Sequence, residues 1–212
     1  MERRIKVTMS RPIIALDADG VLLDYSSAYA AAWERAFGAR PTERDPTAYW
    51  PIDRWNVPRL SGASLEQFRT CFDDQFWSSI PAIAGALEAC IRMHHAGYDL
   101  ICVSALDARF EASRVRNLRD LGFPIARVIA TPVQATADSP KVGALKALMP
   151  AAFVDDYLPY FRGLPSGVHK ALIHRERTGS PNVGPDLSAV SSEHVDLAGF
   201  ANWWLAKPMA SR

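Results

Sequence analysis

The apolar positions of this chain form short runs that alternate with longer amphipathic stretches. Residues 13–16 are all apolar and are followed by the turn signal Asp19-Gly20, so they predict a short buried strand. After Pro81 the alternation becomes regular, because runs of strand length are separated by segments with helical spacing. The predicted strands are 12–16, 98–103, 126–130, 152–154 and 168–173. The first predicted helix begins at a cap formed by Ser26 or Ser27 and ends at Phe37. The other predicted helices are 61–76, 85–95, 109–121, 142–149 and 196–205.

Strands that alternate with helices at this spacing predict a parallel sheet covered on both faces. The expected fold class is therefore α/β, with a Rossmann-like doubly wound core. The stretch between the first two strands is too long for a simple crossover, and it is rich in proline and aromatic residues. We expect residues 25–80 to form a small, mainly α-helical cap domain, inserted into a core of residues 1–24 and 81–212.

Length and charge narrow the class of protein further. A chain of 212 residues can form one large core, or one core with a small second domain. Its 24 basic and 23 acidic residues nearly cancel, which gives no electrostatic reason to expect a nucleic-acid surface. No segment is long and apolar enough to span a membrane, and the basic residues 1–11 lack the apolar stretch of a signal peptide. The three cysteines show no close pair and fit a reducing compartment, so we expect a cytoplasmic protein.

Polar residues follow several predicted strands at their carboxyl ends, which is where open parallel sheets form their sites. Such residues converge at one edge of the sheet, although they are far apart in the sequence. They are Asp17 and Asp19 after the first strand, Ser104 after the second, Asp155 and Asp156 after the fourth, and Lys141 at the start of the helix before the fourth.

This set of side chains suits phosphoryl transfer. Crowded carboxylates repel one another unless a cation neutralises them, and oxygen ligands suit Mg²⁺. A carboxylate can attack phosphorus to form an acyl phosphate, while a Ser hydroxyl and a Lys ammonium hold the phosphoryl oxygens. A second carboxylate two residues beyond the nucleophile can protonate the leaving oxygen and later activate water, and Asp17 and Asp19 have that spacing.

These residues resemble four motifs of the haloacid dehalogenase superfamily. The run 14–24, which reads Ile-Ala-Leu-Asp-Ala-Asp-Gly-Val-Leu-Leu-Asp, is similar to its first motif. Residues 100–104 resemble the second motif, Lys141 the third and residues 153–156 the fourth. Residues 80–89 are similar to the usual passage from cap to core in that superfamily. The resemblance thus covers most of residues 12–160.

The resemblance implies a role for each matching position. The insertion between the first two motifs is similar to the helical caps of the superfamily, which close over small substrates. The implied activity is a Mg²⁺-dependent phosphatase that acts on a small phosphorylated substrate. The implied roles are nucleophile and metal ligand for Asp17, general acid/base with a backbone carbonyl on the metal for Asp19, phosphate binding for Ser104 and Lys141, and metal binding for Asp155 and, directly or through water, Asp156.

Other residues compete for parts in this site. Lys146 is an alternative to Lys141, although Lys141 opens its helix and stands closer to the sheet edge. Asp107 and Arg109 follow Ser104 in a loop that faces the predicted site, so they are candidates for substrate contact. The cap offers arginines that can pair with a substrate anion or lie in solvent, and aromatic residues that can stack on a ring, form the cap core, or join two copies in a homodimer. The cap arginines are Arg35, Arg40, Arg44, Arg54 and Arg59.

Several other functions use similar residues. A haloacid dehalogenase also has a carboxylate nucleophile, but a halide needs no proton to leave, so Asp19 favours a phosphate ester. A phosphotransferase differs only in the acceptor of the phosphoryl group. A phospho-acceptor signalling domain has its acid pair before the phosphorylated Asp in the sequence, which is the reverse of the order here. A binding module without catalytic activity has no need of all the acids, the Ser and the Lys together. A short nucleotide, a sugar phosphate and a phospho-acid all remain open as substrates.

Overall fold

The computed structural model describes residues 11–133 and 137–207, and within these ranges six parallel strands form one sheet. The strands are β1 (Ile13–Leu16), β2 (Asp99–Ala105), β3 (Ile125–Thr131), β4 (Ala152–Asp155), β5 (His169–Ile173) and β6 (Ser192–His194). Their order is β3-β2-β1-β4-β5-β6, so the order reverses at β1, which pairs with both β2 and β4. The predicted Rossmann-like α/β core is confirmed. Residues 1–10, 134–136 and 208–212 of the predicted core ranges lie outside the described residues.

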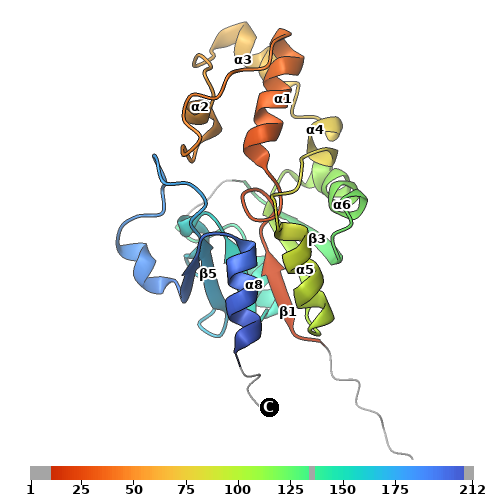
Figure 1. Ribbon diagram of the computed structural model, residues 1–212, viewed down its shortest axis with the longest axis vertical. Helices are drawn as coiled ribbons and strands as arrows, with labels where there is room; N and C mark the ends of the chain where they lie inside the picture. The colour runs from red at the N-terminus through yellow and green to blue at the C-terminus, as the bar shows by residue number, and fades with distance from the viewer. Residues whose placement is uncertain (1–10, 134–136, 208–212) are drawn as a thin grey trace, which may run out of the picture.

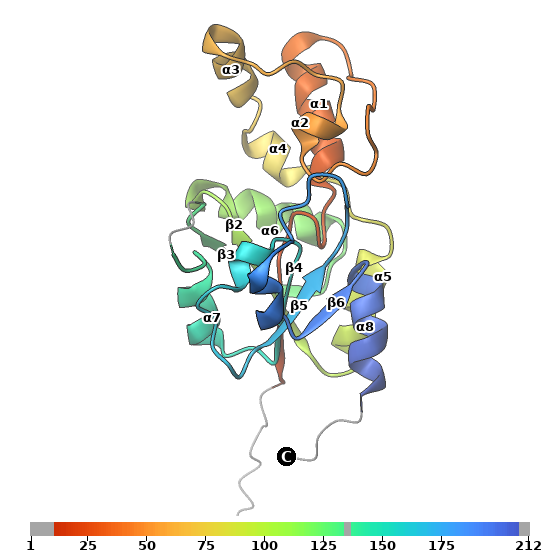
Figure 2. The same cartoon turned by 90° about the vertical axis from the view of Figure 1, so that its left-hand side faces the viewer.

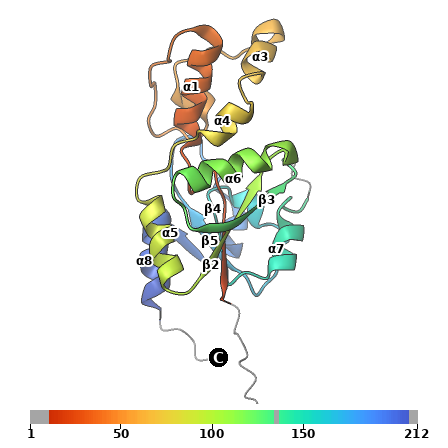
Figure 3. The ribbon, with the colours of Figure 1, turned by 90° about the vertical axis from the view of Figure 1, so that its right-hand side faces the viewer.

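Both faces of the sheet are buried. On β1, Ile14 packs in one apolar cluster with Met93 and Phe200, whereas Ala15 belongs to a second cluster with Leu145. Successive residues of a strand point to opposite faces, so two clusters require helices on both sides. These helices are α5 (Ala86–His95), α6 (Glu111–Asp120) and α8 (Leu197–Ala206) with the first cluster, and α7 (Val142–Leu148) with the second (Figure 3). Short 3-10 helices span Ala108–Phe110, Leu158–Phe161 and Pro185–Ala189.

Four further helices lie beyond the carboxyl ends of the strands, apart from the sheet (Figures 1 and 2). They are α1 (Tyr25–Phe37), α2 (Pro51–Arg54), α3 (Gly62–Arg69) and α4 (Asp74–Ser78). Aromatic rings hold this layer together, because the ring of Phe68 lies 5.1 Å from those of Tyr29 and Phe72 and 5.3 Å from that of Trp33. The division of the chain into a core and a cap domain of residues 25–80 stays a prediction.

Helix ends differ from the sequence prediction where a side chain caps the backbone. The single helix predicted for residues 61–76 is wrong, because Asp73 begins a new helix by accepting a hydrogen bond from the N–H of Phe76 at 3.0 Å. Asp24, instead of Ser26 or Ser27, caps α1 and accepts from the N–H of Ser27 at 3.1 Å. Strand β6 was not predicted, since its sequence Ser-Glu-His has no apolar run. No helix within the described ranges is both long enough and apolar enough to cross a bilayer.

Candidate active site

The turn after β1 brings its acids against the end of β4. The N–H of Asp17 donates to the carbonyl of Val154 at 2.9 Å, so Asp17 still lies beside β4. Gly20 has a φ of +86°, and a Cβ at this position would lie 2.1 Å from Oδ2 of Asp156. Only glycine combines this left-handed conformation with the close approach of Asp156. The Asp-Gly signal in the sequence therefore reflects packing against the fourth strand.

Three buried carboxylates meet at this edge of the sheet. Asp17, Asp155 and Asp156 each offer an oxygen, and these atoms lie within 4.8 Å of one another. Burial raises the pKa of Asp155 well above its ordinary value and raises the pKa of Asp156 to about 7. A bound cation would remove this cost, and three carboxylate oxygens fit the preference of Mg²⁺. The carboxylate of Asp19 is not in this group, and only its backbone carbonyl was predicted to contact the metal.

Lys141 lies between two of the acids. Its Nζ is 2.6 Å from Oδ1 of Asp17 and 2.6 Å from Oδ2 of Asp155, and its side chain is fully buried. Burial opposes its charge, but the two carboxylates outweigh this effect and raise the pKa of Lys141, so the ammonium form is stable. Lys146 is exposed on α7. Of the two competing lysines, the structure places Lys141 at the acids.

Asp19 points into the same site but has a different partner. Both of its carboxylate oxygens lie 2.9 Å from Nη2 of Arg114, a fully buried residue of α6. Burial has the largest effect and raises the pKa of Asp19, while the charge of Arg114 opposes the rise. The sequence pattern does not single out Arg114, because its helix carries several arginines and their spacing does not separate a buried one from exposed ones.

Two further residues complete the edge. Ser104, at the end of β2, is buried and lines the cavity at the site. Arg175 follows β5, and its Nε lies 3.7 Å from Oδ2 of Asp156. Arg175 was not among the predicted site residues, although its place just beyond the predicted fifth strand was a usable signal.

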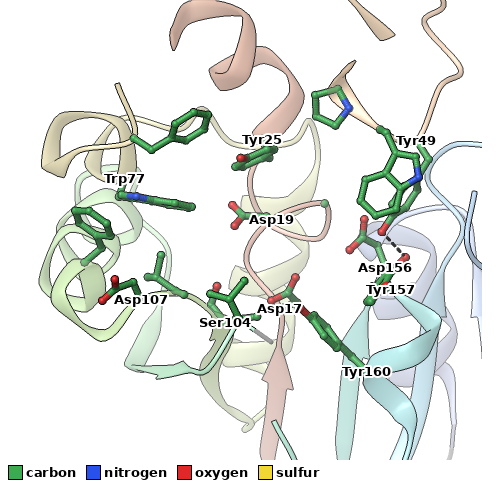
Figure 4. A pocket seen from close by; sticks show the side chains of 18 of the residues that line it. Asp17, Asp19, Tyr25, Tyr49, Trp77, Ser104, Asp107, Asp156, Tyr157 and Tyr160 are labelled. Atoms are coloured by element: carbon green, nitrogen blue, oxygen red, sulfur yellow. Dashed lines mark hydrogen bonds between the residues drawn. The ribbon is translucent and has the colours of Figure 1, made fainter. Parts of the chain in front are cut away.

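A cavity of about 810 Å³ opens above these residues. Asp17, Asp19, Ser104 and Asp156 line it, as Figure 4 shows, whereas Lys141 and Asp155 are not among its lining residues. The cavity lies between the sheet edge and the layer of α1 to α4, where a substrate would meet both.

Some of the residues predicted to contact substrate line the cavity, and others do not. Asp107 and Arg109 line the cavity and form an ion pair of 3.2 Å with each other. Arg54 is not among the lining residues, and it pairs with Glu43 at 2.7 Å and with Glu176 at 2.8 Å. Its place is therefore at a contact between the α2 region and the loop after β5.

That contact ties the helical layer to the core. The N–H of Tyr49 donates to the carbonyl of Thr178 at 2.9 Å. The Arg54–Glu176 ion pair joins the same two chain segments. Figure 2 shows the segment after β5 rising towards α2. Two chain segments more than a hundred residues apart thus close one side of the cavity.

Comparison with known proteins places the chain by its fold. Neither a protein family nor a curated protein matches the chain by sequence. Among solved structures, an L-2-haloacid dehalogenase matches with 19% identity over 93% of this chain and 100% of its own, at a TM-score of 0.57. The L-2-haloacid dehalogenase of Xanthobacter autotrophicus, with chloropropionic acid covalently bound, matches with 13% identity over 94% and 100%, at a TM-score of 0.59.

A haloacid dehalogenase family hydrolase from Deinococcus radiodurans R1, with bound phosphate and sodium, also matches. The identity is 16% over 90% of this chain and 93% of that one, at a TM-score of 0.56. These likenesses show that the chain has the fold of the haloacid dehalogenase superfamily, as its motifs predicted. The matches include dehalogenases and a hydrolase with bound phosphate, so the shared fold does not distinguish between these two reactions.

Proposed function

We propose that this protein is a phosphohydrolase that releases phosphate from a small phosphorylated metabolite, with Asp17 as the nucleophile. The observation that carries the proposal is the position of Asp19, a second acid that lines the same cavity as Asp17. The alkoxide that leaves a phosphate ester needs a proton, whereas a halide does not. A site with both acids therefore favours phosphate over a halogenated substrate.

The reaction proceeds in two displacements at phosphorus. The carboxylate of Asp17 forms a bond to phosphorus, the bond to the leaving oxygen breaks, and Asp19 donates its proton to that oxygen. Asp19 then takes a proton from a water molecule, which attacks phosphorus and breaks the bond to Asp17. Ser104, which lines the cavity, holds a phosphoryl oxygen, and Lys141 orients the carboxylate of Asp17 through its 2.6 Å contact.

The acid cluster supports a role for Mg²⁺ in this reaction. Asp17, Asp155, Asp156 and the backbone carbonyl of Asp19 would hold the ion. When bound, Mg²⁺ would neutralise part of the charge that otherwise keeps a phosphate away from these carboxylates. The bound phosphate and sodium of the D. radiodurans relative in fold support a site for both an anion and a cation.

The experiment that tests the proposal measures phosphate release from 4-nitrophenyl phosphate, with Mg²⁺ and with EDTA. We expect metal-dependent release by the wild type and none by Asp17→Asn. The control is Asp120→Asn, the same change at an exposed position of α6, which should retain activity.

Dehalogenation is the second candidate, because solved dehalogenases share the fold. Chloride release from 2-chloropropionate should be measured beside phosphate release in the same samples. Chloride release without phosphate release would replace the proposal with a dehalogenase that uses Asp17. A folded wild type that hydrolyses the phosphate ester and leaves 2-chloropropionate intact would support the phosphohydrolase.

A further inference from the structure

Eight aromatic side chains line the active-site cavity, in two groups. One group lies on the side of α4 and α6, where the ring of Trp77 is 6.2 Å from Tyr25 and 5.8 Å from Phe110. We call these three residues and Phe72, which also lines the cavity, the Trp77 cluster. Figure 4 shows Tyr25 and Trp77 pointing into the space above Asp19 and Ser104.

A second group of rings faces the site from the other side. The ring of Trp50 is 4.9 Å from Tyr49 and 6.3 Å from Tyr157, and Tyr157 in turn is 4.8 Å from Tyr160. All four rings line the cavity. The space beside the reacting acids is therefore bounded by aromatic side chains on two sides.

Most polar side chains of the cavity are placed at the reacting acids or in ion pairs. Asp17, Asp19, Ser104 and Asp156 lie at the sheet edge, while Asp107 pairs with Arg109 at 3.2 Å. Against the two aromatic groups, a leaving group with many hydroxyls would meet mainly ring surface, and a buried hydroxyl without a hydrogen-bond partner is costly. Apolar and aromatic surface instead suits a flat ring.

The charged residues at the cavity do not require a second anionic end on the substrate. Arg69 and Arg109 line the cavity, but Arg69 pairs with Glu66 at 2.7 Å and Arg109 pairs with Asp107 at 3.2 Å. Both arginine side chains are mostly exposed, so their charges are already balanced or hydrated. Arg175 also lines the cavity, and it faces Oδ2 of Asp156 at 3.7 Å and Oε1 of Glu176 at 4.0 Å. Each arginine of the cavity thus already has a carboxylate partner, with which the second charge of a phospho-acid would have to compete.

We infer that the substrate is a phosphate monoester whose leaving group carries a planar aromatic ring, which stacks on the Trp77 cluster while the phosphate lies at Asp17. This inference rests on the proposed phosphohydrolase activity and adds the chemical class of the leaving group. The volume of about 810 Å³ is large enough for a ring-bearing group, since ligand pockets commonly span about 300–1,000 Å³.

The test compares esters that differ in the ring and not in the reacting bond. The first pair is 2-phenylethyl phosphate and 2-cyclohexylethyl phosphate, whose leaving alcohols have similar size and acidity. Stacking should raise kcat/KM for the phenyl ester between about fivefold and a hundredfold, mainly through KM. Adenosine 5′-monophosphate and ribose 5-phosphate form the second pair, which differs by the base. A preference for adenosine 5′-monophosphate in the second pair would identify the leaving group as a nucleoside. A preference for the phenyl ester in the first pair alone would identify it as an aryl alcohol.

A variant assigns the preference to the cluster. Trp77→Leu keeps an apolar side chain and removes the ring, so the ratio between the two esters of the preferred pair should fall towards one. Trp203→Leu is the matched control, because Trp203 lies on α8 and does not line the cavity, and it should leave the ratio unchanged.

The outcomes separate this inference from the proposed function. Equal hydrolysis of both members in each pair by the wild type, with turnover that depends on Asp17, would overturn the inference and leave the phosphohydrolase in place. Failure to release phosphate from these esters and from acetyl phosphate, which has no ring, would overturn both. The wild-type comparison needs no variant, so it decides the question even if Trp77→Leu does not fold.

Discussion

Replacing Lys141 with Met removes a buried charge while keeping a long, unbranched side chain. Lys141 makes two contacts of 2.6 Å, to Asp17 and to Asp155, and without it these buried carboxylates face each other unpaired. Loss of one partner from a buried ion pair typically costs about 3–5 kcal/mol. We expect the free energy of unfolding of Lys141→Met in EDTA at pH 8 to fall by about this amount, measured by urea denaturation followed by tryptophan fluorescence.

Lys146→Met is the matched control, because it makes the same change at an exposed position of the same helix. It should alter the free energy of unfolding by less than about 0.5 kcal/mol. Adding Asp155→Asn to Lys141→Met should restore part of the lost stability, since one of the two unpaired charges is then gone. A Lys141→Met protein as stable as Lys146→Met would refute the view that this lysine balances the acids.

Three further predictions concern the acids. Gly20→Ala should lower the free energy of unfolding in urea by about 1–3 kcal/mol, because the φ of Gly20 is +86°. It should also abolish the stabilisation of the protein by Mg²⁺, because the new methyl group would displace Asp156. A variant that Mg²⁺ stabilises as much as the wild type would contradict this prediction. Because burial raises the pKa of Asp156 from 3.8 to about 7, the metal-free protein should lose stability as pH rises through this range, by up to roughly 4 kcal/mol. Asp156→Asn should remove that loss of stability. If the wild type and Asp156→Asn show the same pH profile of thermal unfolding in EDTA, the assignment to Asp156 is wrong. Asp19→Asn should slow hydrolysis of alkyl phosphates by about 10²–10⁴-fold in steady-state assays, and a loss confined to Mg²⁺ affinity would rule out the acid/base role.

The sequence predicted the sheet well because buried parallel strands leave a plain signal. The run before Asp17 has no polar residue, and the rule that sites form at strand ends then pointed to Ser104 and to the Asp155-Asp156 pair. The structure brings all of these residues to one edge. Strand β6 lacked the signal, because an edge strand of three residues need not be apolar.

Residues that act through tertiary contacts were harder to predict. Arg114 and Arg175 read as ordinary surface arginines, and only the folded chain shows that they lie against Asp19 and Asp156. The break before Asp73 was missed because helical spacing of the apolar residues continues across it. Local capping here outweighs the pattern of apolar positions.

The most direct test of the proposed mechanism is whether Asp17 carries the phosphoryl group during turnover. The substrate of choice is 4-nitrophenyl phosphate, because its leaving group departs without a proton, and the protein of choice is Asp19→Asn, which lacks the base for hydrolysis. Rapid mixing with Mg²⁺ should give a burst of nitrophenolate equal to the enzyme concentration, and mass spectrometry of the quenched protein should place the phosphoryl group on Asp17. Steady turnover with no burst and an unmodified Asp17 would contradict the proposed mechanism.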